Sequence, residues 1–111
     1  MISPPFPSLP VRVRVRGETH GGIALLDTGF EGDIIIPARL SVGFPGRTQD
    51  LILADGSPTD APVLGGYVRL ADLEYVPADI MFLGAEFIIG AGILRRYEVI
   101  LDHGQRVIVN P

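Results

Sequence analysis

The chain has 111 residues, 47% hydrophobic and 20% charged, a composition typical of one globular domain over residues 1–111 and not of a disordered chain. Its net charge of −4 argues against binding to nucleic acid or to a membrane surface, because both need a surplus of basic residues. The absence of cysteine excludes disulfides, thiolate metal sites and a cysteine nucleophile.

The first residues of the sequence indicate the cellular compartment in which we expect the protein. Residues 1–7 lack the basic start and the continuous apolar stretch of a secretion signal, so we expect a cytoplasmic protein. The most apolar region, residues 80–94, is too short to span a bilayer and is interrupted by glycines. We interpret this region as a buried strand followed by a short helix.

Short apolar runs dominate the rest of the chain. Fourteen Gly and ten Pro separate these runs, a pattern that favours many brief strands and an all-β barrel or sandwich. Residues 11–16 alternate Val and Arg, so the valines of this strand share one face while the arginines face solvent or a partner. Gly21 and Gly22 predict a turn, followed by an apolar strand over residues 23–26 whose two faces must both be covered.

The later elements include a hairpin that we expect to project from the domain. Asp55-Gly56, the strongest short-range hairpin signal in the chain, stands between two apolar runs and is followed by a polar tip. In chain order, the sequence predicts a strand over 34–36 ended by Pro37, a helical turn over 38–42, strands over 51–54, 61–70, 75–83 and 87–89, a short helix over 93–97, and a closing hairpin of 98–102 with 106–109.

Chemistry is concentrated at the end of the strand over residues 23–26. There Asp27-Thr28-Gly29 supplies a carboxylate, a hydroxyl and a glycine. A buried Asp is costly unless it is hydrogen-bonded or shares a proton with another carboxylate. The tripeptide alone favours a structural turn in which Asp27 and Thr28 satisfy backbone donors.

A second motif makes the first more specific. Ile88-Ile89-Gly90 has a hydrophobic-hydrophobic-glycine form and precedes the predicted helix. With these motifs and the hairpin between them, the chain resembles the retropepsin-like aspartic proteases over residues 11–109, in the order and spacing of that family. The resemblance implies an all-β acid-protease barrel with a flap hairpin and one short helix near the C-terminus.

The resemblance also implies an aspartic endopeptidase that is active only as a homodimer. Peptide hydrolysis by this route needs two carboxylates about a water, one accepting its proton while the other, protonated, polarises the carbonyl. A twofold axis between Asp27 and its symmetry mate supplies both groups. By the same resemblance the Thr28 hydroxyl reaches the partner's backbone, while Gly29 lets backbone N–H groups approach the carboxylates.

Further positions follow from the resemblance. Ile88 and Ile89 pack behind the catalytic loop next to Gly90, although ordinary core packing is compatible with the same placement. The flap closes over an extended peptide or unfolded protein substrate, with a plain surface hairpin as the alternative. Its tip comprises Ala54, Asp55, Gly56 and Ser57.

Other parts of the sequence bear on the activity. His20 and His103 have no Cys or paired His nearby, so we expect no metal, and the proposed route needs no cofactor. Phe30, Ala91 and Gly92 depart from the better-known viral members, and an arginine expected to pair with an acid near position 31 is missing. Arg95 or Arg96 is the alternative partner for Glu31.

Two other functions stay open on the sequence alone. One is a catalytically silent member of the same fold that serves as a dimerisation or peptide-binding module. The other is a small β-barrel that binds a ligand as a monomer, which a solution mass of a single chain would indicate.

Overall fold

The computed structural model of the protein describes residues 7–41, 47–52, 58–102 and 106–111. The described chain is mostly β, with short helices in two places. The strands are β1 (Ser8–Val15), β2 (Glu18–Asp27), β3 (Ile34–Ile36), β4 (Arg47–Ile52), β5 (Pro58–Leu70), β6 (Val76–Phe82), β7 (Phe87–Gly90), β8 (Glu98–Asp102) and β9 (Arg106–Asn110). The helices are the 3₁₀ helix η1 (Ala38–Ser41) and the α-helix α1 (Ala91–Leu94). Within the described ranges, no helix is long and apolar enough to cross a membrane.

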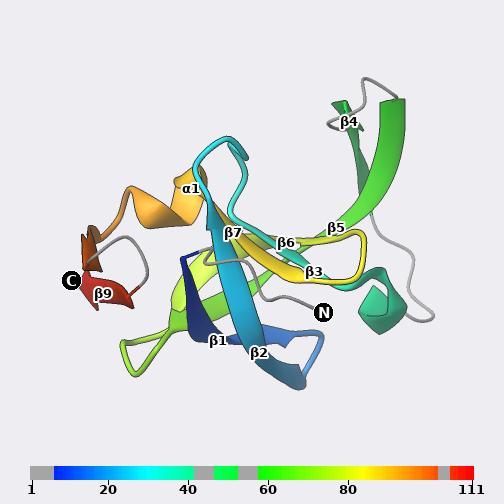
Figure 1. The fold of residues 1–111 in the computed structure, drawn as a ribbon. Helices are drawn as coiled ribbons and strands as arrows, with labels where there is room; N and C mark the ends of the chain where they lie inside the picture. Colours follow the sequence, from blue (N-terminus) through cyan, green and yellow to red (C-terminus); the bar gives the residue numbers. More distant parts are fainter. Residues whose placement is uncertain (1–6, 42–46, 53–57, 103–105) are drawn as a thin grey trace.

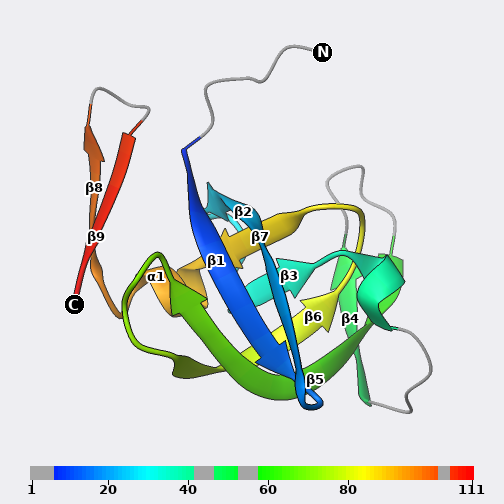
Figure 2. The ribbon, with the colours of Figure 1, turned by 90° about the horizontal axis from the view of Figure 1, so that it is seen from below.

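A closed barrel of six strands forms the body of the molecule (Figures 1 and 2). The main sheet has the order β1-β2-β7-β3-β6-β5-β4, and a second pairing of β1 with β5 joins its two sides. Closure leaves β4 outside the barrel, paired only with β5 among the described strands. The expected all-β architecture is thus confirmed. Closure of the barrel also pairs the strand edges that an open sheet would leave exposed.

Alternation along β1 shows how the sequence fills this barrel. The valines at 11, 13 and 15 are 3%, 0% and 4% exposed, whereas Arg12 and Arg14 lie outside. Burying every second residue is the geometry of a strand with one face on the core. The rest of the main core is isoleucine-rich, and its fully buried members include Ile34, Ile36, Ile80, Ile89 and Ile93.

The order of three strands creates a crossing that the site depends on. β7 lies between β2 and β3, parallel to β2 and antiparallel to β3. The 28–33 connection from β2 to β3 must therefore pass over the end of β7. The sequence predicts both β3 and β7 as strands but does not show which strands pair, so this arrangement is a property of the tertiary fold.

Two hairpins extend from the barrel. The β4–β5 hairpin was expected from Asp55-Gly56, and its two strands pair, but β4 begins at Arg47, before the predicted 51–54, and β5 begins at Pro58, within the predicted polar tip. Residues 53–57 lie outside the described residues. The β8–β9 hairpin forms a separate two-stranded sheet at one side (Figure 2). Its inner face packs on the core through side chains that include Val99, Val107 and Val109, while Ile100 and Ile108 remain exposed.

The structure corrects the predicted turn at Gly21-Gly22. Both glycines lie inside β2, and the turn instead falls at Arg16-Gly17, where both residues have positive φ. Positive φ at two successive positions is typical of a tight hairpin turn. Gly22 has a packing role, because a Cβ there would collide with the ring of Phe87.

Two smaller expectations also change. Ile23 is 62% exposed, so one face of the apolar strand is not covered within a single chain. The helix begins at Ala91 and ends at Leu94, earlier than the predicted 93–97. Gly92 lies in this helix. A Cβ at this position would collide with the side chain of Asp33 and with the backbone of Gly32, so only a glycine leaves room for the neighbouring loop.

Truncation of Ile89 tests the assignment of the core. Ile89 is fully buried between β2 and β3, so Ile89→Ala should lower the free energy of unfolding by about 3 kcal/mol through lost burial and a residual cavity. Ile23→Ala, on an exposed side chain, should cost about 0.5 kcal/mol or less. Urea denaturation at one fixed protein concentration measures both, and equal losses would contradict the assignment.

Candidate functional site

The 28–33 loop is fastened to the strand that it crosses. Backbone N–H groups of Gly90, Ala91 and Gly92 donate to the carbonyl oxygens of Asp33, Phe30 and Gly32 at 2.9, 2.7 and 3.0 Å. The loop therefore satisfies backbone groups at the end of β7 and at the start of α1, which would otherwise lack partners.

Gly90 makes this close crossing possible. A Cβ at this position would collide with the carbonyl oxygen of Gly32 and with the ring and carbonyl oxygen of Phe30. Any side chain at this point would push the loop away from β7, because backbone atoms have little freedom to move aside. The glycine of the Ile-Ile-Gly motif thus has a steric reason that the sequence alone does not reveal.

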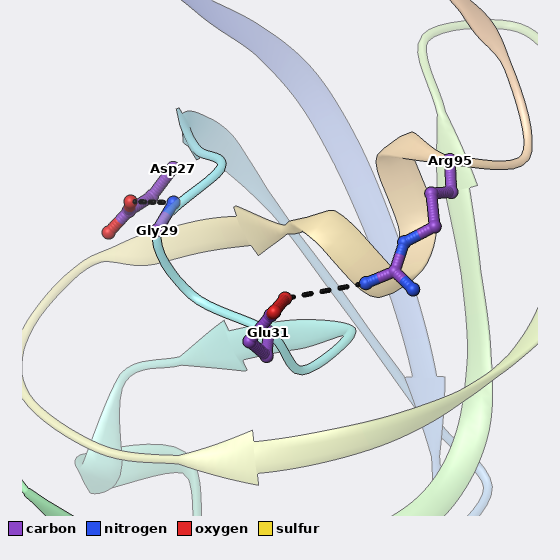
Figure 3. Close-up of polar contacts among 4 residues, drawn as sticks. All are labelled: Asp27, Gly29, Glu31 and Arg95. Carbon is purple, nitrogen blue, oxygen red and sulfur yellow. Dashed lines mark hydrogen bonds and ion pairs between the residues drawn. The ribbon is translucent and has the colours of Figure 1, made fainter.

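Asp27 is the last residue of β2, and in the parallel register it lies beside Gly90. Its carboxylate is exposed, and its Oδ1 accepts a hydrogen bond from the Gly29 N–H at 2.9 Å (Figure 3). The Phe30 N–H donates to the Asp27 carbonyl oxygen at 3.2 Å, which closes a turn. The carboxylate is therefore held at the rim of the barrel, and its exposure corrects the expectation of a buried acid.

Gly29 and Thr28 complete the tip of this turn. A Cβ on Gly29 would come within 3.2 Å of Asp27 Oδ1, a tight contact beside the hydrogen bond that this residue donates. Thr28 is exposed and borders a mainly apolar hollow of about 560 Å³ between the barrel and the C-terminal hairpin. Leu26, Tyr97 and Leu101 also line this hollow.

The structure places the predicted supporting residues beside the turn. Ile88 and Ile89 pair with Leu25 and Leu26 of β2, so they are the β7 residues that lead up to the Asp27–Gly90 pair. Ile89 is fully buried in the main core, and Ile88 packs against the second apolar cluster near Phe30. Their place next to the loop is also what ordinary core packing would produce.

The predicted flap residues Ala54, Asp55, Gly56 and Ser57 lie outside the described residues. The strands of their hairpin are described, and β5 continues from its pairing with β4 into the barrel. Figure 1 shows this hairpin rising on the same side of the barrel as the 28–33 loop. The hairpin and Asp27 thus belong to the same end of the molecule.

The acid at position 31 has the partner that we expected. The Arg95 guanidinium lies 3.4 Å from the Glu31 carboxylate (Figure 3). The two side chains are 67% and 83% exposed, so the pair contributes little to stability in salt. The pair links the loop to the chain just after α1.

Asp33 has a structural role that the sequence interpretation missed. Its Oδ2 accepts a hydrogen bond from the Asp79 N–H at 2.9 Å, which joins the loop to β6. A hollow of about 300 Å³ next to this contact is lined by residues that include Phe30, Val63 and Met81. An acid directly before a buried strand is the only sequence signal for this contact, and such a signal does not identify its partner.

Comparisons with known proteins assign no family, because no protein-family model matches the chain and no curated protein is similar to it. Among the described residues, no group of three or more His, Cys, Asp or Glu side chains is placed to hold a metal ion. The function is therefore inferred from the motifs and from the geometry around Asp27.

Gly90→Ala tests whether the 28–33 loop depends on its close approach to Gly90, and Gly65→Ala is the control. The first should lower the free energy of unfolding by about 3 kcal/mol, because the new methyl group collides with the loop. Gly65 is exposed, and a Cβ added there would meet no atom within 4 Å, so its replacement should change the free energy of unfolding by about 0.5 kcal/mol or less.

Chemical denaturation measures both changes, and amide exchange at Ala91 and Gly92 reports on the loop contacts themselves. We expect faster exchange at these two amides in Gly90→Ala only. Unchanged exchange in that variant would show that the loop does not depend on the close approach.

Proposed function

We propose that the protein is an aspartic endopeptidase with a retropepsin-like fold, in which the Asp27 carboxylates of a homodimer activate a water molecule. The observation that carries this proposal is the placement of Asp27. Its carboxylate is exposed at the rim of the barrel and accepts a hydrogen bond from the Gly29 N–H. Asp27 itself lies beside Gly90, at the start of the loop that crosses β7. An acid fixed in position yet open to solvent is suited to meet a second copy of itself.

The chemistry requires the two carboxylates to differ in protonation. One accepts a proton from the water as its oxygen attacks the peptide carbonyl carbon, while the other donates a proton to the carbonyl oxygen. Two close carboxyls share one proton because both cannot ionise cheaply. Collapse of the tetrahedral intermediate breaks the C–N bond: the carboxyl that took the water's proton gives it to the leaving amine, while the other carboxylate takes a proton back from a hydroxyl of the intermediate, which becomes the product carboxylic acid.

The surface beside Thr28 supports a second copy as the partner. The hollow of about 560 Å³ there is mainly apolar, and Leu101 at its edge is 50% exposed. Exposed apolar surface next to a polar rim is typical of protein interfaces.

An extended peptide or an unfolded protein is the substrate that we propose. The β4–β5 hairpin stands on the same side as Asp27 and would cover such a peptide. The hollow of about 300 Å³ beside Phe30 offers room for one of its side chains. Covering the peptide excludes water that is not used in the reaction.

A catalytically silent dimerisation or peptide-binding module of the same fold is the second candidate. Phe30 favours it, because this bulky ring lines the hollow next to the loop, where a small residue is usual in the family that the chain resembles. Peptide binding that is the same for the parent and for Asp27→Asn, with no cleavage by either, would support this candidate.

Asp27→Asn should abolish proteolysis while the fold is retained. Removing one member of a catalytic unit lowers the rate by about a thousandfold or more, and Asn cannot exchange the proton. The control is Asp72→Asn, an exposed acid in the turn between β5 and β6, which should keep full activity. Cleavage of an unfolded protein is followed between about pH 4 and 7, and full activity of Asp27→Asn would refute the proposal.

Thr28→Ala should weaken the dimer, and Thr28→Ser is the matched control because it keeps the hydroxyl. Dilution should then lower the specific activity of Thr28→Ala more steeply than that of the parent, as expected when two chains form one site. Sedimentation and activity are measured over the same concentration series. A parent that stays active as a single chain would contradict a shared site.

A further inference from the structure

A cationic face lies on the outer side of β1 and β5. Apart from two histidines, all basic residues of this acidic chain are arginines, nine in number against thirteen acids. Arg12 and Arg14 project outward from β1 because the alternate valines are buried, and Arg69 lies between the buried Val68 and Leu70 of β5. Together with Tyr67 and Tyr75, these arginines form what we call the arginine face.

Two like charges meet directly on this face. Arg12 and Arg69 are register partners in the antiparallel pairing of β1 with β5, so their side chains leave the same side of the sheet. Like charges in directly opposed positions destabilise a sheet. In the described part of the chain, no carboxylate lies within ion-pair distance of either guanidinium.

Arg69 carries a second unfavourable feature. Its Nε is buried and has no hydrogen-bond partner among the described residues. An unpaired buried donor costs free energy, more so when the group is charged. An anion that binds the accessible guanidinium nitrogens of Arg12 and Arg69 would offset the repulsion between the two like charges.

The neighbouring residues shape a groove beside this pair. Arg14 is the register partner of Tyr67, which is 51% exposed, and the Arg14 guanidinium lies 5.3 Å from the centre of the Tyr75 ring. A hollow of about 530 Å³ is lined by residues that include these three, Arg16 and the two glycines Gly65 and Gly66. The hollow therefore combines cationic and aromatic walls.

The arginine face is remote from the proposed active site. Arg12 is the register partner of Gly21 in β2, and Asp27 lies six residues further along this strand, a distance of about 20 Å at ~3.3 Å per residue. Figure 1 shows the turn between β1 and β2 at the bottom and the 28–33 loop at the top. A ligand on the arginine face would thus leave Asp27 free.

We propose that the arginine face binds an acidic segment of a polypeptide in extended form. The planar guanidinium matches a carboxylate with two parallel hydrogen bonds. Arg12 and Arg14 are two residues apart, so their side chains are about 7 Å apart, as are alternate side chains of an extended peptide. The edges of β1 are already paired with β2 and β5, so the segment lies across the face and does not add a strand.

A polypeptide fits this face better than a nucleic acid does. The face presents three guanidinium groups, whereas tight binding to nucleic acid uses about six to ten phosphate contacts. Tyrosine side chains next to arginines provide contact area for the peptide between its acidic side chains.

The test uses the full chain and a fluorescein-labelled decaglutamate peptide, with decaglutamine as the neutral probe. Fluorescence anisotropy at low salt should show binding of decaglutamate only, and added salt should weaken it. The same titration in Asp27→Asn removes any effect of hydrolysis. Absence of binding to decaglutamate at low salt, or equal binding of decaglutamine, would overturn the proposal.

Paired variants locate the site. Arg12→Gln with Arg69→Gln should raise the Kd for decaglutamate at least tenfold, whereas Arg39→Gln with Arg106→Gln, which removes the same charge elsewhere, should leave it within twofold. Arg14→Gln, which keeps the Arg12–Arg69 pair, should raise the Kd about threefold. This variant replaces the double variant as the test if the double variant does not fold. Equal losses in both pairs, or tighter binding of a ten-nucleotide oligothymidylate than of decaglutamate, would contradict the proposal.

Discussion

The close crossing of the 28–33 loop over Gly90 is the contact on which the candidate site depends. Hydrogen bonds from residues 90–92 hold the loop, and the lack of a side chain at Gly90 lets it approach. Because Asp27 ends the strand that leads into this loop, the crossing also determines where its carboxylate lies. The core behind β7 makes the crossing rigid, so packing and chemistry are connected at one point.

A single chain leaves this site incomplete for the chemistry that we propose. Asp27 stands exposed at the rim, and one carboxylate cannot both accept and donate the protons of peptide hydrolysis. The apolar hollow beside Thr28 is on the same part of the surface. Pairing of two chains would therefore cover exposed apolar surface and complete the catalytic group in one step, which makes activity depend on concentration.

Acidic and basic side chains are concentrated in different places on the surface, at the 28–33 loop and on the arginine face. Carboxylates gather around the crossed loop, where Asp27, Glu31 and Asp33 lie, whereas arginines dominate the outer face of β1 and β5. The arginines lie on the outer face because the alternation of β1 directs Arg12 and Arg14 outward. The carboxylates lie at the loop because the polar residues that follow β2 form it.

Local patterns in the sequence determined much of this protein. The Val-Arg alternation of β1, the hairpin of β4 and β5, and the Asp27-Thr28-Gly29 turn were predictable because each depends on neighbouring residues alone. The tertiary structure decided the rest. In the sequence Gly22 and Gly90 indicate breaks between strands, whereas in the fold they leave room for the ring of Phe87 and for the loop that crosses β7. Contacts between residues far apart in the chain, such as Asp33 with Asp79, leave no local pattern, so only the folded barrel could reveal them.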